Sequence, residues 1–163
     1  MRYFYDTEFL DDGSTIDLIS IGIVAEDGRE YYAVSLDAGW DRILDNEWLV
    51  ENVVSQLPEV YGVGPEWKTR ETMASEISRF IPGPRSCNEL WAYYAAYDHV
   101  ALCQLFGRMI DLPPNIPMFS HDIKAEADRL GVYPLPVQDT GHHNALDDAR
   151  WNRDAYNFMF GGP

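Results

Sequence analysis

The chain has 163 residues, of which 46% are hydrophobic and 13% aromatic, and its 27 acidic against 12 basic side chains give a formal net charge of −15. A composition this rich in apolar and aromatic residues excludes an acidic disordered tail, and the length suits one domain over residues 1–163 that buries a sizeable core. The net charge argues against non-specific binding to nucleic acid or to an anionic membrane surface.

The first part of the chain predicts three strands in a meander. Residues 2–6 are aromatic enough for a short strand, and residues 16–25 are apolar enough for a strand in the centre of a sheet. An Asp-Gly pair at 27–28 between two apolar runs predicts a hairpin. We therefore expect a third strand at about residues 30–36 that pairs antiparallel with the second.

The remainder of the chain is expected to alternate between helices and strands. Apolar residues at helical spacing predict a helix that Thr69 or Thr72 caps and that ends at the Pro-Gly-Pro sequence 82–84. In chain order, the other elements expected are a partly helical segment at 40–57, a strand at 89–95, a helix at 98–109, a strand at 117–120, a helix at 122–130 closed by Gly131, and a helix at 145–160. This order predicts an α/β fold with a mixed five-stranded sheet flanked by helices.

Two further features of the sequence concern the cellular compartment. No uninterrupted apolar stretch approaches the roughly 18 residues of a transmembrane helix, and residues 1–10 carry Asp6 and Glu8 in place of the apolar run of a signal peptide. The two cysteines, Cys87 and Cys103, are too few for a disulfide framework. We therefore expect a cytoplasmic protein with no membrane partner.

Asp6 and Glu8 lie two residues apart at the end of the first predicted strand. Because side chains alternate between the faces of a strand, both carboxylates share one face with Phe4. Taken alone, the pair is typical of a polar strand end that meets solvent.

Two aspartates are predicted to point with the apolar face of a helix. Asp98 precedes Leu102, and Asp148 precedes Ala155, at helical spacing. An N-cap is the alternative for Asp98, but an unpaired charge on an apolar face is costly. Together with the strand-end pair, these positions indicate one or two shared divalent cations, and oxygen ligands favour Mg²⁺ or Mn²⁺ over zinc.

A pair of histidines precedes the last predicted helix. Asn144 is a natural N-cap, and Asp147 follows three residues later, where a carboxylate stabilises the helix N-terminus. His143 then lies just outside the cap, with Asp148 one turn into the helix. A loop histidine is commonly plain surface, but beside metal-binding carboxylates His143 could deprotonate a water near neutral pH.

Three segments in this order resemble the motifs of the DEDDh superfamily of 3′–5′ exonucleases, which has a ribonuclease H-like fold. Residues 6–8 (DTE) resemble the first motif, residues 92–98 (AYYAAYD) the second, and residues 143–149 (HNALDDA) the third. The chain is most similar to the ribonuclease AS family of adenylate-preferring 3′-exoribonucleases, through residues 5–13 and 91–98. It departs from many members of the superfamily, which carry His-Asn where this chain has Tyr93 and Tyr94.

The resemblance implies a catalytic set for phosphodiester hydrolysis. It implies Asp6, Glu8, Asp98 and Asp148 as ligands of two Mg²⁺ or Mn²⁺ ions, and His143 as the general base. Two cations roughly 3.5–4 Å apart can serve both the attacking and the leaving oxygen of an in-line displacement. The resemblance also implies a homodimer.

The terminal nucleotide of a substrate must also be bound. Phe9 and Leu10 directly follow the D-x-E pair and are therefore placed to contact the last sugar and base. Unstacked RNA bases stack on aromatic faces for about 1–3 kcal/mol each, although aromatic residues in a strand commonly belong to the core. The substrate contacts expected are Thr7, Phe9, Leu10, Trp91 and Tyr94.

These observations lead to one main functional hypothesis and two alternatives. The main hypothesis is a metal-dependent 3′–5′ exoribonuclease that trims the 3′ end of single-stranded, possibly adenylated RNA and releases nucleoside 5′-monophosphates. The first alternative is the same chemistry on single-stranded DNA or mixed substrates. The second is a non-catalytic acidic protein that mimics nucleic acid, which the charge fits but the aspartates on apolar helix faces do not.

Overall fold

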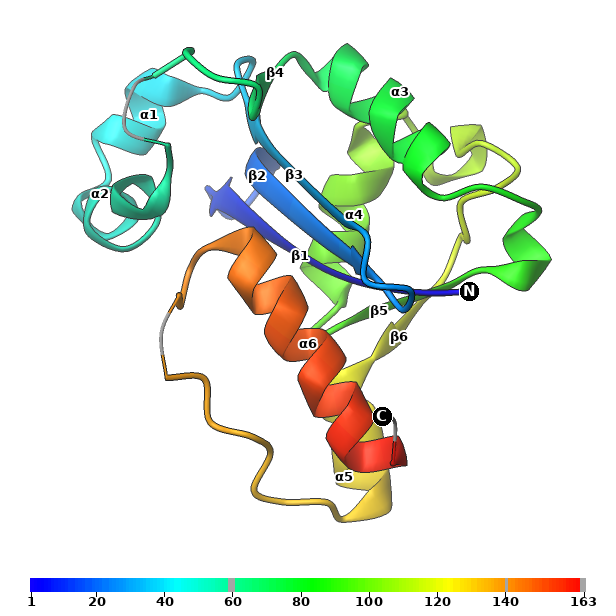
Figure 1. The fold of residues 1–163 in the computed structure, drawn as a ribbon. Helices are drawn as coiled ribbons and strands as arrows, with labels where there is room; N and C mark the ends of the chain where they lie inside the picture. Colours follow the sequence, from blue (N-terminus) through cyan, green and yellow to red (C-terminus); the bar gives the residue numbers. More distant parts are fainter. Residues whose placement is uncertain (59–60, 140, 162–163) are drawn as a thin grey trace.

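Six strands form one mixed sheet in the order β4-β3-β2-β1-β5-β6 (Figure 1). The structure is a computed structural model, and it describes residues 1–58, 61–139 and 141–161. The strands are β1 (Arg2–Asp11), β2 (Ile16–Ala25), β3 (Glu30–Ser35), β4 (Trp67–Lys68), β5 (Glu89–Ala92) and β6 (Ser120–Asp122). The architecture confirms the predicted α/β class with a mixed sheet and is compatible with a ribonuclease H-like fold.

The predicted meander is present at the centre of the sheet. β1, β2 and β3 pair antiparallel in sequence, and the turn between β2 and β3 has Gly28 at φ +88°, a conformation that glycine adopts without strain. β1 is longer than the predicted strand 2–6, because its pairing with β2 continues past a bulge at Glu8 and Phe9. The carboxylates therefore lie within the strand and not at its end.

The sheet has six strands and not the five predicted from the sequence. β4 consists of Trp67 and Lys68 only, which pair parallel with Val34 and Ser35 of β3. Two residues are too short to show the alternation that predicts a strand. Likewise, β5 ends at Ala92 and β6 begins at Ser120, so both differ from the predicted strands at 89–95 and 117–120.

Six α-helices and three short 3₁₀ helices complete the described chain. The α-helices are α1 (Trp40–Leu44), α2 (Glu47–Asn52), α3 (Arg70–Phe80), α4 (Ala96–Gln104), α5 (Ile123–Leu130) and α6 (Ala145–Phe160), and the 3₁₀ helices are η1 (Val54–Gln56), η2 (Arg85–Cys87) and η3 (Met109–Asp111). Thr69 caps α3 by accepting from the Thr72 N–H, and Gly131 closes α5 at φ +66°. α4 is shorter than predicted, because Gly107 at φ +110° cannot continue a helix.

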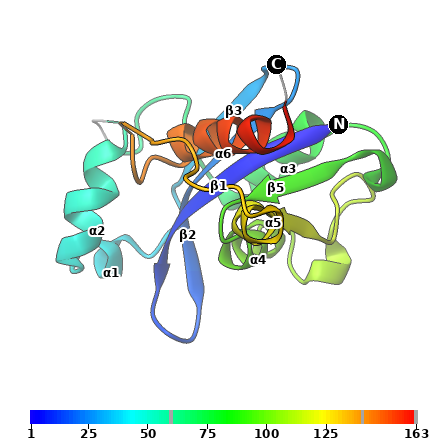
Figure 2. The same ribbon diagram turned by 90° about the horizontal axis from the view of Figure 1, so that it is seen from below.

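The helices cover both faces of the sheet. α3 and α4 pack against one face in a cluster that includes Tyr5, Ile21, Met73 and Leu102, all fully buried. α5 and α6 pack against the other face, and Figure 1 shows α6 in front of the strands and α4 behind them. Figures 1 and 2 both show α1 and α2 as a separate group at one end of the molecule. Among the helices of the described residues, none has the length and apolar composition that crossing a membrane requires.

Candidate active site

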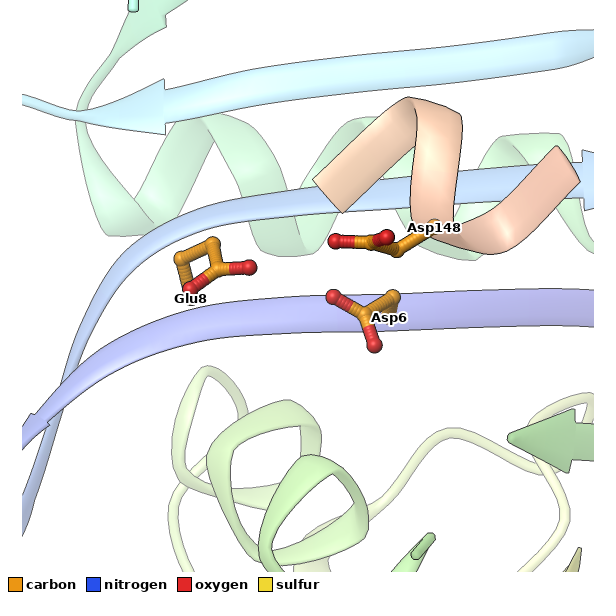
Figure 3. Close-up of side chains that lie close together, drawn as sticks. All are labelled: Asp6, Glu8 and Asp148. Carbon is orange, nitrogen blue, oxygen red and sulfur yellow. The ribbon is translucent and has the colours of Figure 1, made fainter. Parts of the chain in front are cut away.

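Three carboxylates from two distant parts of the chain meet on the face of the sheet that α6 covers. Asp6 and Glu8 project from β1, and Asp148 projects from the first turn of α6 (Figure 3). One oxygen from each carboxylate lies within 4.8 Å of the others, which is close enough to share a metal ion. The structure therefore brings together three of the four carboxylates that the sequence predicts as ligands.

A glycine in β2 allows α6 to approach this closely. Gly22 is the partner of Asp6 in the β1–β2 pairing, and a Cβ at this position would overlap the backbone carbonyl of Ala145. The first turn of α6 thus rests directly on the strand, held there by Asn144, whose side chain accepts from the N–H groups of Leu146 and Asp147. This confirms Asn144 as the predicted N-cap, whereas the role of Gly22 was not predicted.

Asp98 reaches the site from the edge of β1. β5 ends at Ala92, so the backbone N–H of Thr7 lies beyond the end of the parallel strand and donates to Asp98 Oδ1 at 2.9 Å. The Thr7 hydroxyl donates to the same oxygen at 2.6 Å. α4 begins at Ala96, so Asp98 lies within its first turn and is not the N-cap. Asp98 is only 5% exposed and borders the three-carboxylate cluster without belonging to it.

Burial raises the pKa values of these carboxylates, and the charges of neighbouring carboxylates raise those of Asp6 and Glu8 further. Burial and the charges of Asp148 and Asp98 raise the pKa of Glu8 to about 8. Burial also raises the pKa of Asp98, to about 6, against the opposing effect of the Thr7 hydrogen bonds. The pKa of Asp6 is raised by burial and by the charges of Asp98, Glu8 and Asp148. Close carboxylates in such surroundings fit a bound divalent cation, which removes their mutual repulsion.

His143 lies beside this cluster in the loop before α6. Its Nδ1 atom is 3.9 Å from Glu8 Oε1. Among the ion pairs of the described residues, this is the one in which a basic side chain faces a carboxylate of the cluster. The Trp48 ring of α2 meets the His143 ring edge to face, with 4.9 Å between the centroids. The Asn144 side chain donates to the carbonyl of Gln56 at 3.3 Å, so α2 and η1 hold this loop from outside.

These side chains line a single cleft with a volume of about 660 Å³. Its lining residues are Asp6, Thr7, Glu8, Phe9, Trp48, Tyr93, Tyr94, Tyr97, Asp98, Pro136, Gln138, His142, His143, Asp148, Trp151 and Asn152. The cleft thus joins all the predicted catalytic residues to an aromatic wall.

Comparison with known proteins assigns the chain to a family. The model of the 3′-5′ exoribonuclease Rv2179c-like domain family matches residues 1–160. The chain belongs to this family. It is 46% identical over 152 residues to the 3′-5′ exoribonuclease Rv2179c of Mycobacterium tuberculosis strain H37Rv. This match covers 92% of the present chain and 88% of that protein. The 3′-5′ exoribonuclease MT2234.1 of strain CDC 1551 has the same identity and coverage.

Two of the predicted substrate contacts do not reach the cleft in this member of the Rv2179c-like family. Leu10 is 7% exposed and packs in a core cluster with residues of α1 and α2. Trp91 is 6% exposed and stacks on His121, with 4.3 Å between the ring centroids. The structure places Trp91 in the core, which was the alternative for aromatic residues of a strand, whereas Thr7, Phe9 and Tyr94 line the cleft.

Several cleft residues of this exoribonuclease-family chain were not predicted. Gln138 donates from Nε2 to Asp148 Oδ1 at 2.7 Å, and Asn152 donates to the carbonyl of Tyr5 at 2.9 Å. Trp48 enters from α2, and Trp151 from α6. Gln138 and Trp48 lie in segments without a chemical motif, so their place in the site follows from chain folding and has no sequence signal.

A second hollow of about 760 Å³ lies between β3, β4 and α3, away from the carboxylates. Its lining mixes basic and acidic side chains, and Lys68 there pairs with Glu76 at 2.8 Å. None of the predicted site residues lines it. The predicted catalytic residues therefore line the cleft beside α6 and not this second hollow.

Proposed function

We propose that this protein is a metal-dependent 3′–5′ exoribonuclease of the DEDDh type, formed by residues 1–163 as one domain, that trims single-stranded RNA. The observation that carries the proposal is the meeting of Asp6, Glu8 and Asp148 beside Asp98 and His143 in one cleft. Membership of the 3′-5′ exoribonuclease Rv2179c-like family supports the same activity.

The carboxylates are proposed to hold two divalent cations, Mg²⁺ or Mn²⁺. The oxygen ligands would come from Asp6, Glu8, Asp98 and Asp148. Their raised pKa values indicate that ionising the four carboxylates together is unfavourable unless bound positive charge compensates them. When bound, such cations stabilise the charge on the attacking and leaving oxygens of a phosphodiester. Gln138 orients Asp148 through its hydrogen bond.

His143 is proposed as the general base. Its side chain is 43% exposed, so water reaches it, and its position beside Glu8 places it at the cluster. With Nδ1 facing Glu8, the Nε2 atom is the one proposed to take the proton from the attacking water. The leaving group is the 3′ oxygen of the shortened RNA, and the product is a nucleoside 5′-monophosphate.

Aromatic rings are proposed to bind the 3′-terminal nucleotide. Phe9 and Tyr97 lie nearly parallel at the cleft, with 5.8 Å between the centroids and 10° between the ring planes. Bases stack on such faces without any positive charge on the protein, which agrees with a net charge of −15 that disfavours binding along the backbone. Stacking also favours the large purine face, and we propose a preference for adenylate on this ground.

The experiment that tests this function is trimming of 5′-labelled A, U, C and G homopolymers in RNA and DNA form with Mg²⁺ or Mn²⁺. We expect a ladder that shortens from the 3′ end, fastest for oligoadenylate RNA, and no reaction in excess EDTA. No shortening of any polymer would contradict the exonuclease function. Equal trimming of DNA would replace the RNA assignment with the mixed-substrate alternative. The homodimer that the family resemblance implies is tested separately by the mass of the purified protein in solution.

A further inference from the structure

Two residues of the cleft share an unusual backbone conformation. Within residues 1–58, 61–139 and 141–161, the non-glycine residues with positive φ are His143 at +63° and Tyr94 at +57°. Both line the same cleft. The left-handed region is unfavourable for a bulky side chain, and such strain concentrates where function requires a side chain to be held in place. His143 has a proposed catalytic role, whereas Tyr94 is so far an expected substrate contact with no particular nucleotide assigned to it.

Burial does not explain the conformation of Tyr94, whose side chain is 62% exposed. Its ring meets Tyr93 edge to face, with 4.6 Å between the centroids, and Tyr93 meets Trp151 in the same manner at 5.1 Å. Trp151 is fixed in turn, because its Nε1 atom donates to the carbonyl of Pro136 at 2.9 Å. These three rings, called here the Tyr94 group, thus form a supported wall whose outermost ring faces the open cleft.

Trp151, which supports the Tyr94 group, and Phe9 lie on opposite sides of the carboxylates along β1. Phe9 follows Glu8 in the strand. Trp151 is one turn further along α6 than Asp148, and its neighbour Asn152 donates to the carbonyl of Tyr5, which precedes Asp6. The phosphate to be cleaved must lie at the carboxylates, so the two nucleotides that it joins extend to opposite sides. Each of these nucleotides therefore has one aromatic group within the cleft.

The surroundings decide which nucleotide belongs to which group. α1 and α2 stand beyond the end of β1 on the Phe9 side, where Trp48 contacts His143 (Figure 1). On the other side the most exposed ring is that of Tyr94, and Val137 next to the cleft is 82% exposed. A chain end fits the side that a helix pair bounds, and the rest of the RNA needs the open side.

We propose that the Tyr94 group stacks on the base of the penultimate nucleotide and that Tyr94 is the residue that contacts it. This assignment rests on the proposed exoribonuclease function and adds a second base-binding position to it. The contact with Tyr93, which Trp151 supports in turn, holds the Tyr94 ring in place before RNA binds, so less freedom is lost on binding. The enzyme therefore reads two stacked bases of a single strand, and a purine in the penultimate position binds best.

The test is a double-mutant cycle between Tyr94 and the penultimate base. The substrates are oligoadenylates that carry either adenine or an abasic nucleotide in the penultimate position, and the variants are Tyr94→Gly and Tyr94→Phe. For the unmodified protein, we expect the abasic nucleotide to lower kcat/KM about tenfold, mainly through KM. Tyr94→Gly should show the same loss on intact oligoadenylate and no further loss on the abasic one, while Tyr94→Phe should behave as the unmodified protein.

Controls separate this role from a structural one. Phe158→Ala removes a ring of similar exposure on α6 that does not line the cleft, and it should leave both substrates unaffected. The thermal midpoint of Tyr94→Gly should be equal to or above that of the unmodified protein, because glycine adopts positive φ without strain.

Two results would overturn the assignment. Independent effects of the variant and the abasic nucleotide would show that Tyr94 does not touch that base. Coupling to an abasic terminal nucleotide instead would move Tyr94 to the other position. If oligoadenylate is trimmed and neither coupling is found, only this inference fails, whereas absence of any trimming removes the proposed function and the inference together.

Discussion

At the scale of single residues, adjacent side chains of the active-site segment have opposite surroundings. Asp148 points into the cluster and accepts from Gln138, whereas Asp147 pairs with Arg150 at 2.5 Å on the outside of α6. His143 faces Glu8, while His142 lines the cleft without an ion pair among the described residues. The geometry of the helix thus gives the two adjacent aspartates different surroundings, and the geometry of the loop does the same for the two adjacent histidines.

The aspartate pair provides a matched test. Asp148→Asn should reduce exonuclease activity by more than about 100-fold, since loss of residues that merely support metal ligands already costs about 10–100-fold. Asp147→Asn should retain most activity, because it loses only a surface ion pair. Rates of oligoadenylate trimming and Mn²⁺ affinity measure both effects. The opposite order would show that the wrong aspartate has been assigned to the metal site.

The histidine pair tests the proposed general base. His143→Ala should lower kcat by about 10²–10⁴-fold, the usual contribution of a positioned base, with a smaller change in KM. His142→Ala removes the adjacent ring of the same cleft and should leave kcat within a few-fold of the unmodified protein. Steady-state kinetics at saturating Mg²⁺ separate the two. Equal loss in both variants would contradict the assignment of His143.

At the scale of elements, the site depends on how closely α6 lies on β2. The loop residue Asn144 caps the helix, Gly22 leaves room for its first turn, and Asn152 ties it to the carbonyl of Tyr5. Patterns within the chain predicted α6 and its cap correctly, since both are local properties. The contact at Gly22 joins residues far apart in the sequence, and no local pattern carries it.

Gly22→Ala should therefore damage the site as well as the fold. A methyl group at this position would push α6 away from β1, lower the free energy of unfolding by about 1–3 kcal/mol and separate Asp148 from Asp6. We expect loss of both Mn²⁺ affinity and activity. Denaturant unfolding and metal titration measure the two effects.

Gly131→Ala is the control for this substitution. A Cβ at Gly131 meets nothing within 4 Å, although φ is +66°. The variant should lose about 1 kcal/mol of stability through strain alone and keep full activity. A Gly22→Ala protein that retains activity would show that the approach of α6 to β2 is not required.

The strands and helices show where local patterns stop predicting. The hairpin at Gly28, a threonine cap at Thr69 or Thr72, of which the structure shows Thr69, and the Gly131 end are predicted because turn and cap residues act within a few positions. β4 was missed because its two residues form a strand only through the partner that β3 offers. Trp91 is predicted as a substrate contact because aromatic rings stack on bases, but it lies on the strand face that packs in the core, which is the alternative for a strand aromatic.

At the scale of the whole molecule, the acidic side chains behind the net charge of −15 differ in whether a basic side chain pairs with them. Many acidic side chains lie on the surface in ion pairs, such as that of Glu30 with Arg150 at 2.6 Å. The carboxylates of the cleft lack such partners among the described residues, apart from the contact of Glu8 with His143. In the metal-free protein, repulsion between the carboxylates of the cleft should therefore lower the free energy of unfolding.

The stability of the metal-free protein should fall as the pH rises from about 6 to about 8. In the folded state the pKa of Glu8 is raised from 4.5 to about 8, so the folded protein holds a proton that the unfolded chain has already released. This contribution to stability is fully present below the ordinary pKa of glutamate and is lost as the pH rises through about 8. Thermal midpoints in EDTA across this range measure the fall.

Comparison with Glu8→Gln isolates the site from the other titrating groups. The variant cannot ionise at this position, so its midpoint should vary less between pH 6 and pH 8. Mg²⁺ or Mn²⁺ at pH 8 should raise the midpoint of the unmodified protein and have little effect on the variant. A midpoint that is independent of metal would contradict the proposed cation site.

Local patterns in the chain were enough to establish the α/β class, most helices and caps, and the candidate set of Asp6, Glu8, Asp98, Asp148 and His143. Periodicity, capping and motif spacing act over a few residues, so they can be recognised without the fold. Only the folded chain decided that α6 lies against β2, that Trp91 is core, and that strained Tyr94 borders the cleft. These features arise from contacts between segments distant in sequence, and their energies depend on the partners that folding supplies.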